Sequence, residues 1–313
     1  MRNTMYRLLR RLLFLLSLLA LALFIVRYWG ALAANSSLEP GCPPDCLGVN
    51  LVQRDLQGIN LHGANLSEAD LSQANLTDAD LSGADLSSAN LTGANLAGAN
   101  LNGAKLIGAN MTQSRLVGAT LDRTNLGSAN LSQAIMSRVV LTGTTLTAAI
   151  LENATLIGAQ LRNVNLSGGK LHNANLGGAS LVSADLSGAD LSSANLSGAL
   201  LGQAMLVGTN LQDSVQVGTD LHAADLRGAD LRAVTLSGAN LVRANLIGAD
   251  LSAATLSGAD FQDASLGHAN LQKATLIGAN LTGTYMIGAD LTGALLDGAE
   301  SASTTVWPEG FKP

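Results

Sequence analysis

The sequence predicts an all-β fold in which short extended segments stack into a solenoid. From Asn50 to Glu300, a unit of the form Ala-(Asp/Asn)-Leu-X-X repeats without an insertion or a deletion. The central residues occupy every position ending in 1 or 6 from Leu51 to Leu296, and all but five of these fifty residues are Leu. An apolar period of five fits neither an α-helix, with its period near 3.6, nor a continuous strand, with its period of 2. Each unit therefore requires one short extended segment and one turn.

Within a unit, Ala and Leu stand two positions apart with a polar residue between them, an alternation typical of a strand with one buried face. The next Ala follows Leu after three positions, so the chain must turn a corner there. Repeats that cannot bury their apolar face singly become stable by stacking. We therefore expect coils that bond to one another through their backbones, with Leu and Ala inside.

The second residue after each centre predicts the size of a coil. Gly occupies 18 of the 25 such positions ending in 8 and only 7 of the 25 ending in 3. This ten-residue period keeps one turn type on each wall only if the number of walls is even, and four is the smallest even number that encloses a core. Four walls give twenty residues per coil and about 12 coils, spaced roughly 4.8 Å apart.

The Gly-rich corners indicate a positive φ, which Gly adopts at little cost, whereas amide residues at the other corners suggest a different turn type. These amide residues are Gln73, Gln113, Gln133, Asn153, Asn163 and Asn173.

The pattern is similar to that of the pentapeptide-repeat family, and the resemblance covers about 80% of the chain. It implies a right-handed quadrilateral β-helix, and the handedness comes from the family rather than from the spacing. It also implies no enzymatic mechanism.

Residues 1–33 have the pattern of an export signal. Four arginines precede a run from Leu12 to Val26 that is apolar except for Ser17, and Ala31-Leu32-Ala33 follows. We expect either a cleaved signal peptide or a signal anchor, in which residues 12–29 form a hydrophobic helix in the membrane. An amphipathic cap helix is a third alternative. In the first two cases the N-terminus stays inside, and the rest of the chain is exported across the cytoplasmic or thylakoid membrane. The exported protein is then either released into the periplasm or lumen or anchored to the membrane.

Residues 34–48 are expected to form a linker and an N-terminal cap that contains the only two cysteines, Cys42 and Cys46. In an exported chain such a pair is more often oxidised than free, so a small disulfide loop is the first interpretation. Two reduced thiols under the cap and a metal or redox pair are the alternatives, although two ligands alone do not make a zinc site. A similar cysteine pair precedes the first repeat in many members of the family.

The β-helix is expected to span residues 49–300, with one polar interruption of its core. Gln216 replaces Leu at a centre, and Ser214 and Thr219 take the inner positions on either side. These residues form an interior polar cluster if Gln216 points inward, because a buried amide needs partners. A local bulge that turns a neighbouring Val inward is the rival interpretation.

Residues 301–313 follow the last unit and are expected to form a C-terminal cap. Trp307 and Phe311 are aromatic residues in a chain with only 3% aromatic content, and Pro308 would prevent another chain from pairing there. A Trp-Pro-x-Gly-Phe ending is also common in the resembling family.

Composition favours a binding function over catalysis. The net charge is −6, and without the five N-terminal arginines 12 basic residues stand against 23 acidic ones. An acidic surface disfavours nonspecific binding to nucleic acid. We expect no catalytic, cofactor or metal site and no small-molecule substrate. We interpret the chain as a noncatalytic scaffold for an unidentified protein partner, with membrane contact only through residues 12–29. The alternative is a DNA mimic that modulates a type II topoisomerase.

Overall fold

The computed structural model describes residues 42–312 of the 313-residue chain. The chain divides into two units, Met1–Cys42 and Pro43–Pro313. The predicted signal segment, residues 1–33, and most of the linker therefore lie outside the described residues. Within residues 42–312 we find no helix of the length and apolarity needed to cross a membrane.

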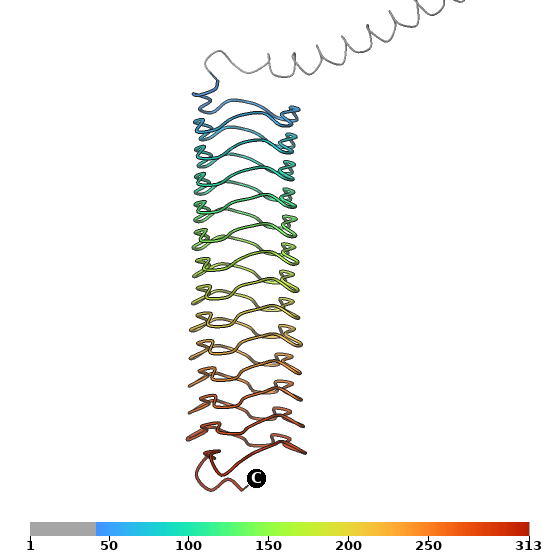
Figure 1. The fold of residues 1–313 in the computed structure, drawn as a ribbon, viewed down its shortest axis with the longest axis vertical. Coiled ribbons are helices and arrows are strands. Elements are labelled where there is room, and N and C mark those ends of the chain that lie inside the picture. The colour runs from blue at the N-terminus through green and yellow to red at the C-terminus, as the bar shows by residue number, and fades with distance from the viewer. Residues whose placement is uncertain (1–41, 313) are drawn as a thin grey trace, which may run out of the picture. The chain divides into compact units, whose positions relative to one another are not determined.

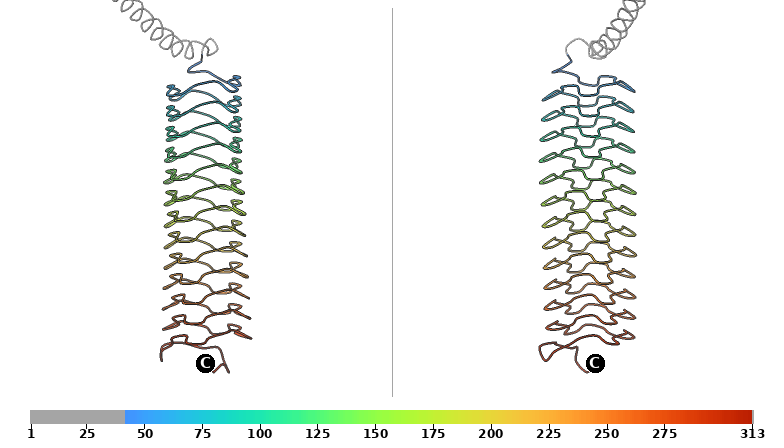
Figure 2. Two further views of the ribbon diagram at one scale, coloured as in Figure 1. Left: turned by 90° about the vertical axis from the view of Figure 1, so that its right-hand side faces the viewer. Right: turned by 45° about the vertical axis from the view of Figure 1, so that its right-hand side comes forward.

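The second unit is a β-helix (Figures 1 and 2). Its register is constant at twenty residues. Parallel bridges join each outward residue to the residue twenty positions later, from Asp45–Asn65 to Asn280–Glu300. Residues 42–312 contain no helix and no strand longer than one bridged residue. Four bridges complete one coil, which confirms the four-walled coil predicted from the Gly period. Each wall is named here by its first complete centre, at residues 51, 56, 61 and 66.

The backbone bonds of one unit show how coils are joined. The Leu71 N–H donates to the Asn90 carbonyl of the next coil over 2.7 Å, and the Gln73 N–H donates to the Thr92 carbonyl over 2.8 Å. The Ala74 N–H turns back to the Leu71 carbonyl over 3.0 Å and closes a β-turn. Each unit thus bonds along the axis and also fixes its own corner.

The outward Asp or Asn side chain accepts a hydrogen bond from the one backbone N–H of a typical unit that forms no bond to another backbone carbonyl. The N–H of the first turn residue, Ser72, donates to the Asp70 Oδ1 atom over 3.0 Å, while the Asp70 N–H itself donates to the Val49 carbonyl of the preceding coil. Short polar side chains that accept from the backbone two residues later are typical of Asx turns. The preference for Asp and Asn before each Leu therefore has a local, structural cause.

The second turn residue has a φ of the same sign at every corner from residue 48 to residue 298, so the predicted difference in turn type is wrong. The second turn residue has a positive φ at Gly and non-Gly corners alike, for example +57° at Gln73 and +65° at Gly83. Amide side chains at non-Gly corners of the Leu51 wall form hydrogen bonds between coils, which offset part of the cost of a positive φ. The Gln53 Nε2 donates to the Gln73 Oε1 over 2.6 Å, and the Gln113 Nε2 donates to the Gln133 Oε1 over 2.9 Å.

Leu and Ala fill the interior. Leu71 and Ala74, like almost all their counterparts along the chain, have no exposed surface. Each wall therefore contributes an inner column of Leu and a column of Ala, and stability comes from stacking successive coils rather than from any one of them. The column also accommodates Phe261, which is fully buried at a centre of the Leu61 wall.

At the N-terminal end, backbone pairing begins within the segment predicted as a cap. Asp45 already bridges Asn65, and Cys46 occupies a centre position at the top of the Leu66 wall with 2% exposure. Cys42 and Cys46 are both disulfide-bonded, and the chain has no other cysteine. Cys46 thus lies directly against the first coil.

At the C-terminal end, the register shifts by one residue. Tyr285 bridges Val306, twenty-one positions later, and the Thr305 hydroxyl donates to the Leu281 carbonyl over 2.8 Å. Residues 301–306 therefore add one more irregular unit to the Leu66 wall. The chain then leaves the ladder.

We predict that Ala233→Gly stabilises the β-helix by about 0.5–1 kcal/mol, because Ala233 holds a φ of +53° that Gly adopts without the Cβ clash. The measurement is chemical denaturation followed by circular dichroism. Ala229→Gly is the matched control: Ala229 is a buried inner residue without a positive φ, so the same change should destabilise there. Equal effects at the two positions would contradict the assignment of strain to the corner.

Candidate functional site

The interior polar cluster keeps the regular register. Gln216 is 1% exposed, whereas its neighbours Val215 and Val217 are 41% and 46% exposed. Val215 also bridges Thr235 in the ordinary way. Gln216 therefore points inward, and the structure shows no bulge that would turn a valine into the core.

The side chains of Gln216 and Thr219 form separate hydrogen bonds and do not bond to each other. The Gln216 Nε2 donates to the Ser214 Oγ over 2.9 Å. The Thr219 hydroxyl instead donates to the Leu196 carbonyl over 2.9 Å. Both side chains are buried within packed columns, so the cluster serves the fold and does not face a substrate-sized space.

Elsewhere in the core, threonine side chains that point inward form the same hydrogen bond as Thr219, from the hydroxyl to the carbonyl of a centre residue in the preceding coil. Thr124 donates to the Leu101 carbonyl over 2.8 Å, and Thr144 donates to the Leu121 carbonyl over 2.6 Å. Each acceptor is a turn carbonyl that already receives one backbone N–H, and its second lone pair is available. Ser114, at the same kind of position, has a buried Oγ without a hydrogen-bond partner in the described chain.

The predicted C-terminal cap residues gather at the last coil. The rings of Trp307 and Phe311 stack on one another with centroids 5.2 Å apart. Residues 308–311 face residues 289–293 of the Leu51 wall across a hollow of about 460 Å³. Leu296, at the end of the Leu56 wall, is only half-buried. The segment thus covers one side of the terminal coil and leaves the other side partly open.

Carboxylates on the acidic part of the surface are held by hydrogen bonds within their own units. The pKa of Asp225 is lowered by a hydrogen bond from the Arg227 guanidinium, whose Nε lies 2.8 Å from the Asp225 Oδ1. The pKa of Asp230 is lowered in the same way by Arg232. These pairs are ion pairs between an outward residue and the first turn residue, so they are typical of local structure rather than of acid–base catalysis.

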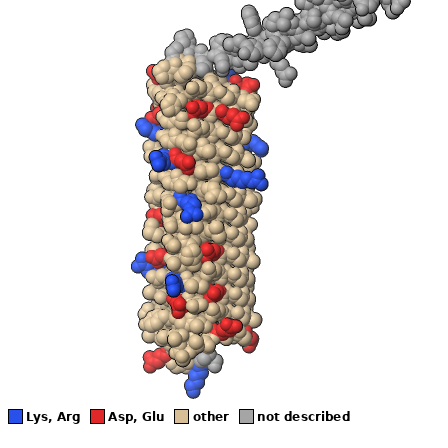
Figure 3. Space-filling model, in the orientation of Figure 1, with Lys and Arg blue, Asp and Glu red and all other residues tan. Residues whose placement is uncertain are grey.

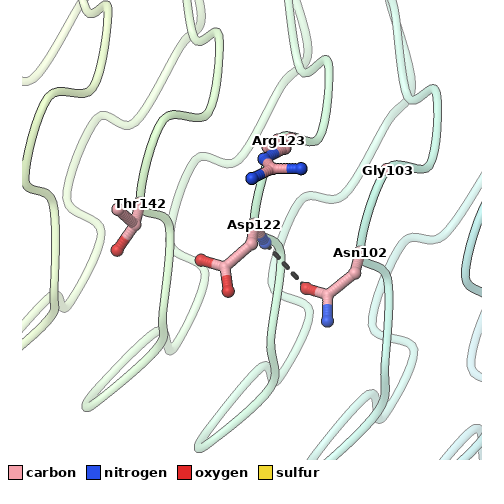
Figure 4. A pocket seen from close by; sticks show the side chains of 5 residues that line it. All are labelled: Asn102, Gly103, Asp122, Arg123 and Thr142. Atoms are coloured by element: carbon pink, nitrogen blue, oxygen red, sulfur yellow. Dashed lines mark hydrogen bonds between the residues drawn. The ribbon is translucent and has the colours of Figure 1, made fainter.

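A second hollow lies on the Leu61 wall and was not anticipated from the sequence. It has a volume of about 610 Å³ and is lined by Asn102, Gly103, Asp122, Arg123 and Thr142 (Figure 4). The outward residue before Leu121 is Thr120 rather than Asp or Asn, so the usual turn acceptor is missing there. The Asn102 Oδ1 of the preceding coil accepts from the Asp122 N–H instead, over 2.8 Å.

Two groups that line this hollow lack a polar partner of the expected kind: a buried carboxylate oxygen of Asp122 has no hydrogen-bond donor, and Arg123 forms no ion pair among residues 42–312. The Asp122 Oδ1 is buried and has no hydrogen-bond partner among the described residues, and Figure 4 shows the Arg123 side chain beside the same hollow. The bond between coils is also long here: the Arg123 nitrogen lies 3.3 Å from the Thr142 carbonyl oxygen, compared with 2.8 Å between Gln73 and Thr92. Within residues 42–312, no group of three or more His, Cys, Asp or Glu side chains is placed to hold a metal ion.

Comparison with known proteins identifies the repeat. A model of pentapeptide repeats matches eight segments that together span residues 45–298. The chain belongs to the pentapeptide repeat family. Members of the family fold as right-handed β-helices, and membership supports the handedness expected from the resemblance.

Several solved structures of pentapeptide repeat proteins are similar to this chain. HetL from the cyanobacterium Nostoc sp. strain PCC 7120, a protein involved in heterocyst differentiation regulation, is 41% identical over 69% of this chain and 86% of its own, with a TM-score of 0.32. A second protein from Nostoc PCC 7120 is 39% identical over 30% of this chain and 77% of its own, with a TM-score of 0.29. A protein of the Arabidopsis thaliana thylakoid lumen is 36% identical over 32% and 63%, with a TM-score of 0.22. No curated protein sequence matches the chain.

The outer surface of this pentapeptide repeat rod carries an uneven charge that total composition conceals. Residues 105–170 contain six Lys or Arg and two Asp or Glu, a net charge of +4, whereas residues 42–104 carry −6 and residues 171–312 carry −8. We call the six cations the basic belt: Lys105, Arg115, Arg123, Arg138, Arg162 and Lys170. On the face that Figure 3 shows, Lys and Arg side chains lie among the acidic ones. A count of charges by coil would have found this belt in the sequence.

We predict that the double variant Ser214→Ala, Gln216→Leu has a higher melting temperature than the wild type. It removes both partners of a buried hydrogen bond, which is nearly neutral, and adds apolar burial of about 1–2 kcal/mol. Thermal denaturation measures this change. Gln262→Leu, at an exposed turn position, is the control and should change the melting temperature little. A drop of several degrees in the double variant would instead make Gln216 part of a stabilising polar network.

Proposed function

We propose that this pentapeptide repeat protein is a noncatalytic scaffold that presents a rigid surface to a protein partner outside the cytoplasmic membrane. The observation that carries the proposal is the constant twenty-residue register from Asp45 to Glu300. It places every outward side chain at a fixed position on one of four walls, with neighbouring coils roughly 4.8 Å apart. A surface that is ordered before binding loses little conformational entropy when a partner docks.

The interior supports binding on the outside rather than chemistry within. Leu and Ala side chains fill the core with little or no exposure. The two hollows described above lie outside this core, one on a wall and one beside the C-terminal segment. We therefore expect the outward and turn residues to contact a partner, because they vary along the chain much more than the inner Leu and Ala positions do.

Export rests on the pattern of residues 1–33, which the described part of the structure does not include. A positive N-terminal flank, an apolar run and an Ala-Leu-Ala sequence are the features that an export signal requires. The disulfide-bonded state of Cys42 and Cys46 agrees with an oxidising compartment. Both cleavage after this segment and its retention as an anchor would place the β-helix on the outer side.

Fractionation of cells that express the full chain with a C-terminal tag tests the compartment. We expect the tagged protein in the membrane, periplasmic or lumenal fraction, because the apolar run of residues 12–26 directs export. Sequencing of the mature N-terminus then separates the two forms: a start near residue 34 indicates cleavage, and an intact start indicates an anchor. Full-length protein in the cytosolic fraction would contradict the proposal.

DNA mimicry against a type II topoisomerase is the alternative function, and the acidic ends of the rod favour it. The basic belt counts against it, because a duplex mimic needs negative charge that continues along its length. We therefore expect the full-length protein at micromolar concentration to leave DNA supercoiling by gyrase unchanged. Inhibition that persists after neutralisation of the belt would favour the mimic instead.

A further inference from the structure

We propose that the basic belt binds a short acidic segment of a protein partner. The proposal rests on the scaffold function given above and names the chemistry of the partner. It depends on three features of the described chain: the reversal of charge along the rod, the scarcity of ion pairs in the belt, and an open corner between two of its arginines.

The charge reversal confines attraction to a short stretch of the rod. The belt spans about three coils, or roughly 16 Å at 4.8 Å per coil, and carries +4 between segments of −6 and −8. Like charges on the flanking segments repel an anion that extends beyond the belt, and this repulsion acts over about 8–10 Å at physiological salt. The belt therefore suits an anionic partner that is itself short.

Most belt cations have no carboxylate partner within the chain. Lys105 lies 3.5 Å from an oxygen of Asp85, and no other belt residue forms an ion pair among residues 42–312. All six belt residues are exposed. Outside the belt, Arg227 and Arg232 each pair with the Asp two positions before them, whereas Arg54 and Arg243 form no ion pair among residues 42–312.

One corner of the belt offers two arginines to the same ligand. Arg123 and Arg162 are turn residues of the Leu61 wall, two coils apart, which corresponds to roughly 10 Å along the axis. Gly143 occupies the corner between them, and the space where its side chain would lie is empty to 4 Å. A guanidinium binds a carboxylate in a bidentate manner, so two carboxylates about 10 Å apart on one chain fit this corner.

The distribution of the belt favours a protein segment over other anions. Its six residues come from all four walls, and a flat membrane surface reaches only one or two walls at a time. A long duplex laid along the rod would meet the acidic segments at both ends of the belt. An acidic stretch of a protein can instead cross the rod at the belt and leave the flanking coils untouched.

The test uses the full-length chain in a nonionic detergent and a fluorescein-labelled peptide with eight Glu residues in a Gly/Ser background. The belt variant is Arg123→Gln with Arg162→Gln. Gln203 and Gln262 already occupy the matching turn positions elsewhere on the Leu61 wall, so we expect the variant to fold. Arg227→Gln with Arg232→Gln is the matched control, because it removes the same charge from the paired arginines outside the belt.

We expect the wild-type protein to bind the Glu peptide in fluorescence anisotropy, with affinity that falls as salt is added. The belt variant should bind about ten-fold more weakly, since two charge-assisted contacts are lost, and the control variant should stay within about two-fold. A peptide with Gln in place of Glu should not bind. Unchanged melting temperatures would show that both variants are folded.

Three results would overturn the proposal. The first is no binding of the Glu peptide, or an equal loss of affinity in both variants. The second is tighter binding to a short duplex or to vesicles that contain anionic lipid than to the peptide. The third is salt-sensitive self-association that only the belt variant abolishes, which would assign the belt to a second copy of this chain. Each would leave the proposed location outside the cytoplasmic membrane standing, because fractionation tests that location independently.

Discussion

The coil-to-coil backbone hydrogen bond is the interaction on which the rest of this molecule depends. Each unit donates two N–H groups to carbonyls of the next coil and closes its own turn with a third. Because all of these bonds depend on one twenty-residue register, one inserted residue would shift every later side chain relative to its wall. The repeats accordingly continue from Asn50 to Glu300 without insertion, and the single shift at Val306 lies beyond them.

The same ladder determines which polar residues the interior tolerates. A turn carbonyl receives one backbone N–H and keeps a second lone pair, so an inward Thr can donate to it, as Thr209 does to the Leu186 carbonyl. Gln216 is too long for that arrangement and bonds the Ser214 hydroxyl instead. Buried polar groups thus survive where the backbone or a neighbouring side chain offers an acceptor or a donor, in keeping with the cost of leaving them unpaired.

Because Leu and Ala fill most of the core, the differences between one coil and another lie mainly in the outward and turn residues. Where Asp or Asn stands before the centre, it accepts from the free turn N–H and often bonds its counterpart in the neighbouring coil, as Asn90 does with Asp70 of the preceding coil. Where cations and apolar residues replace Asp and Asn, between residues 105 and 170, this support is reduced. That stretch carries both the basic belt and the hollow beside Arg123, so the coils with the fewest internal side-chain bonds are the ones with the most distinctive surface.

The sequence alone determined the five-residue unit, the inward Leu and Ala and the twenty-residue coil, because period and side-chain size depend only on local order. It also contained the charge reversal, which becomes visible when charges are counted along the axis. Only the tertiary structure decided that Gln73 and Gly83 share a positive φ, that Asn102 replaces the missing acceptor for Asp122, and that Arg123 and Arg162 flank an open corner. The reason is that these relations join residues of different coils, and their geometry follows from stacking rather than from neighbours in the chain.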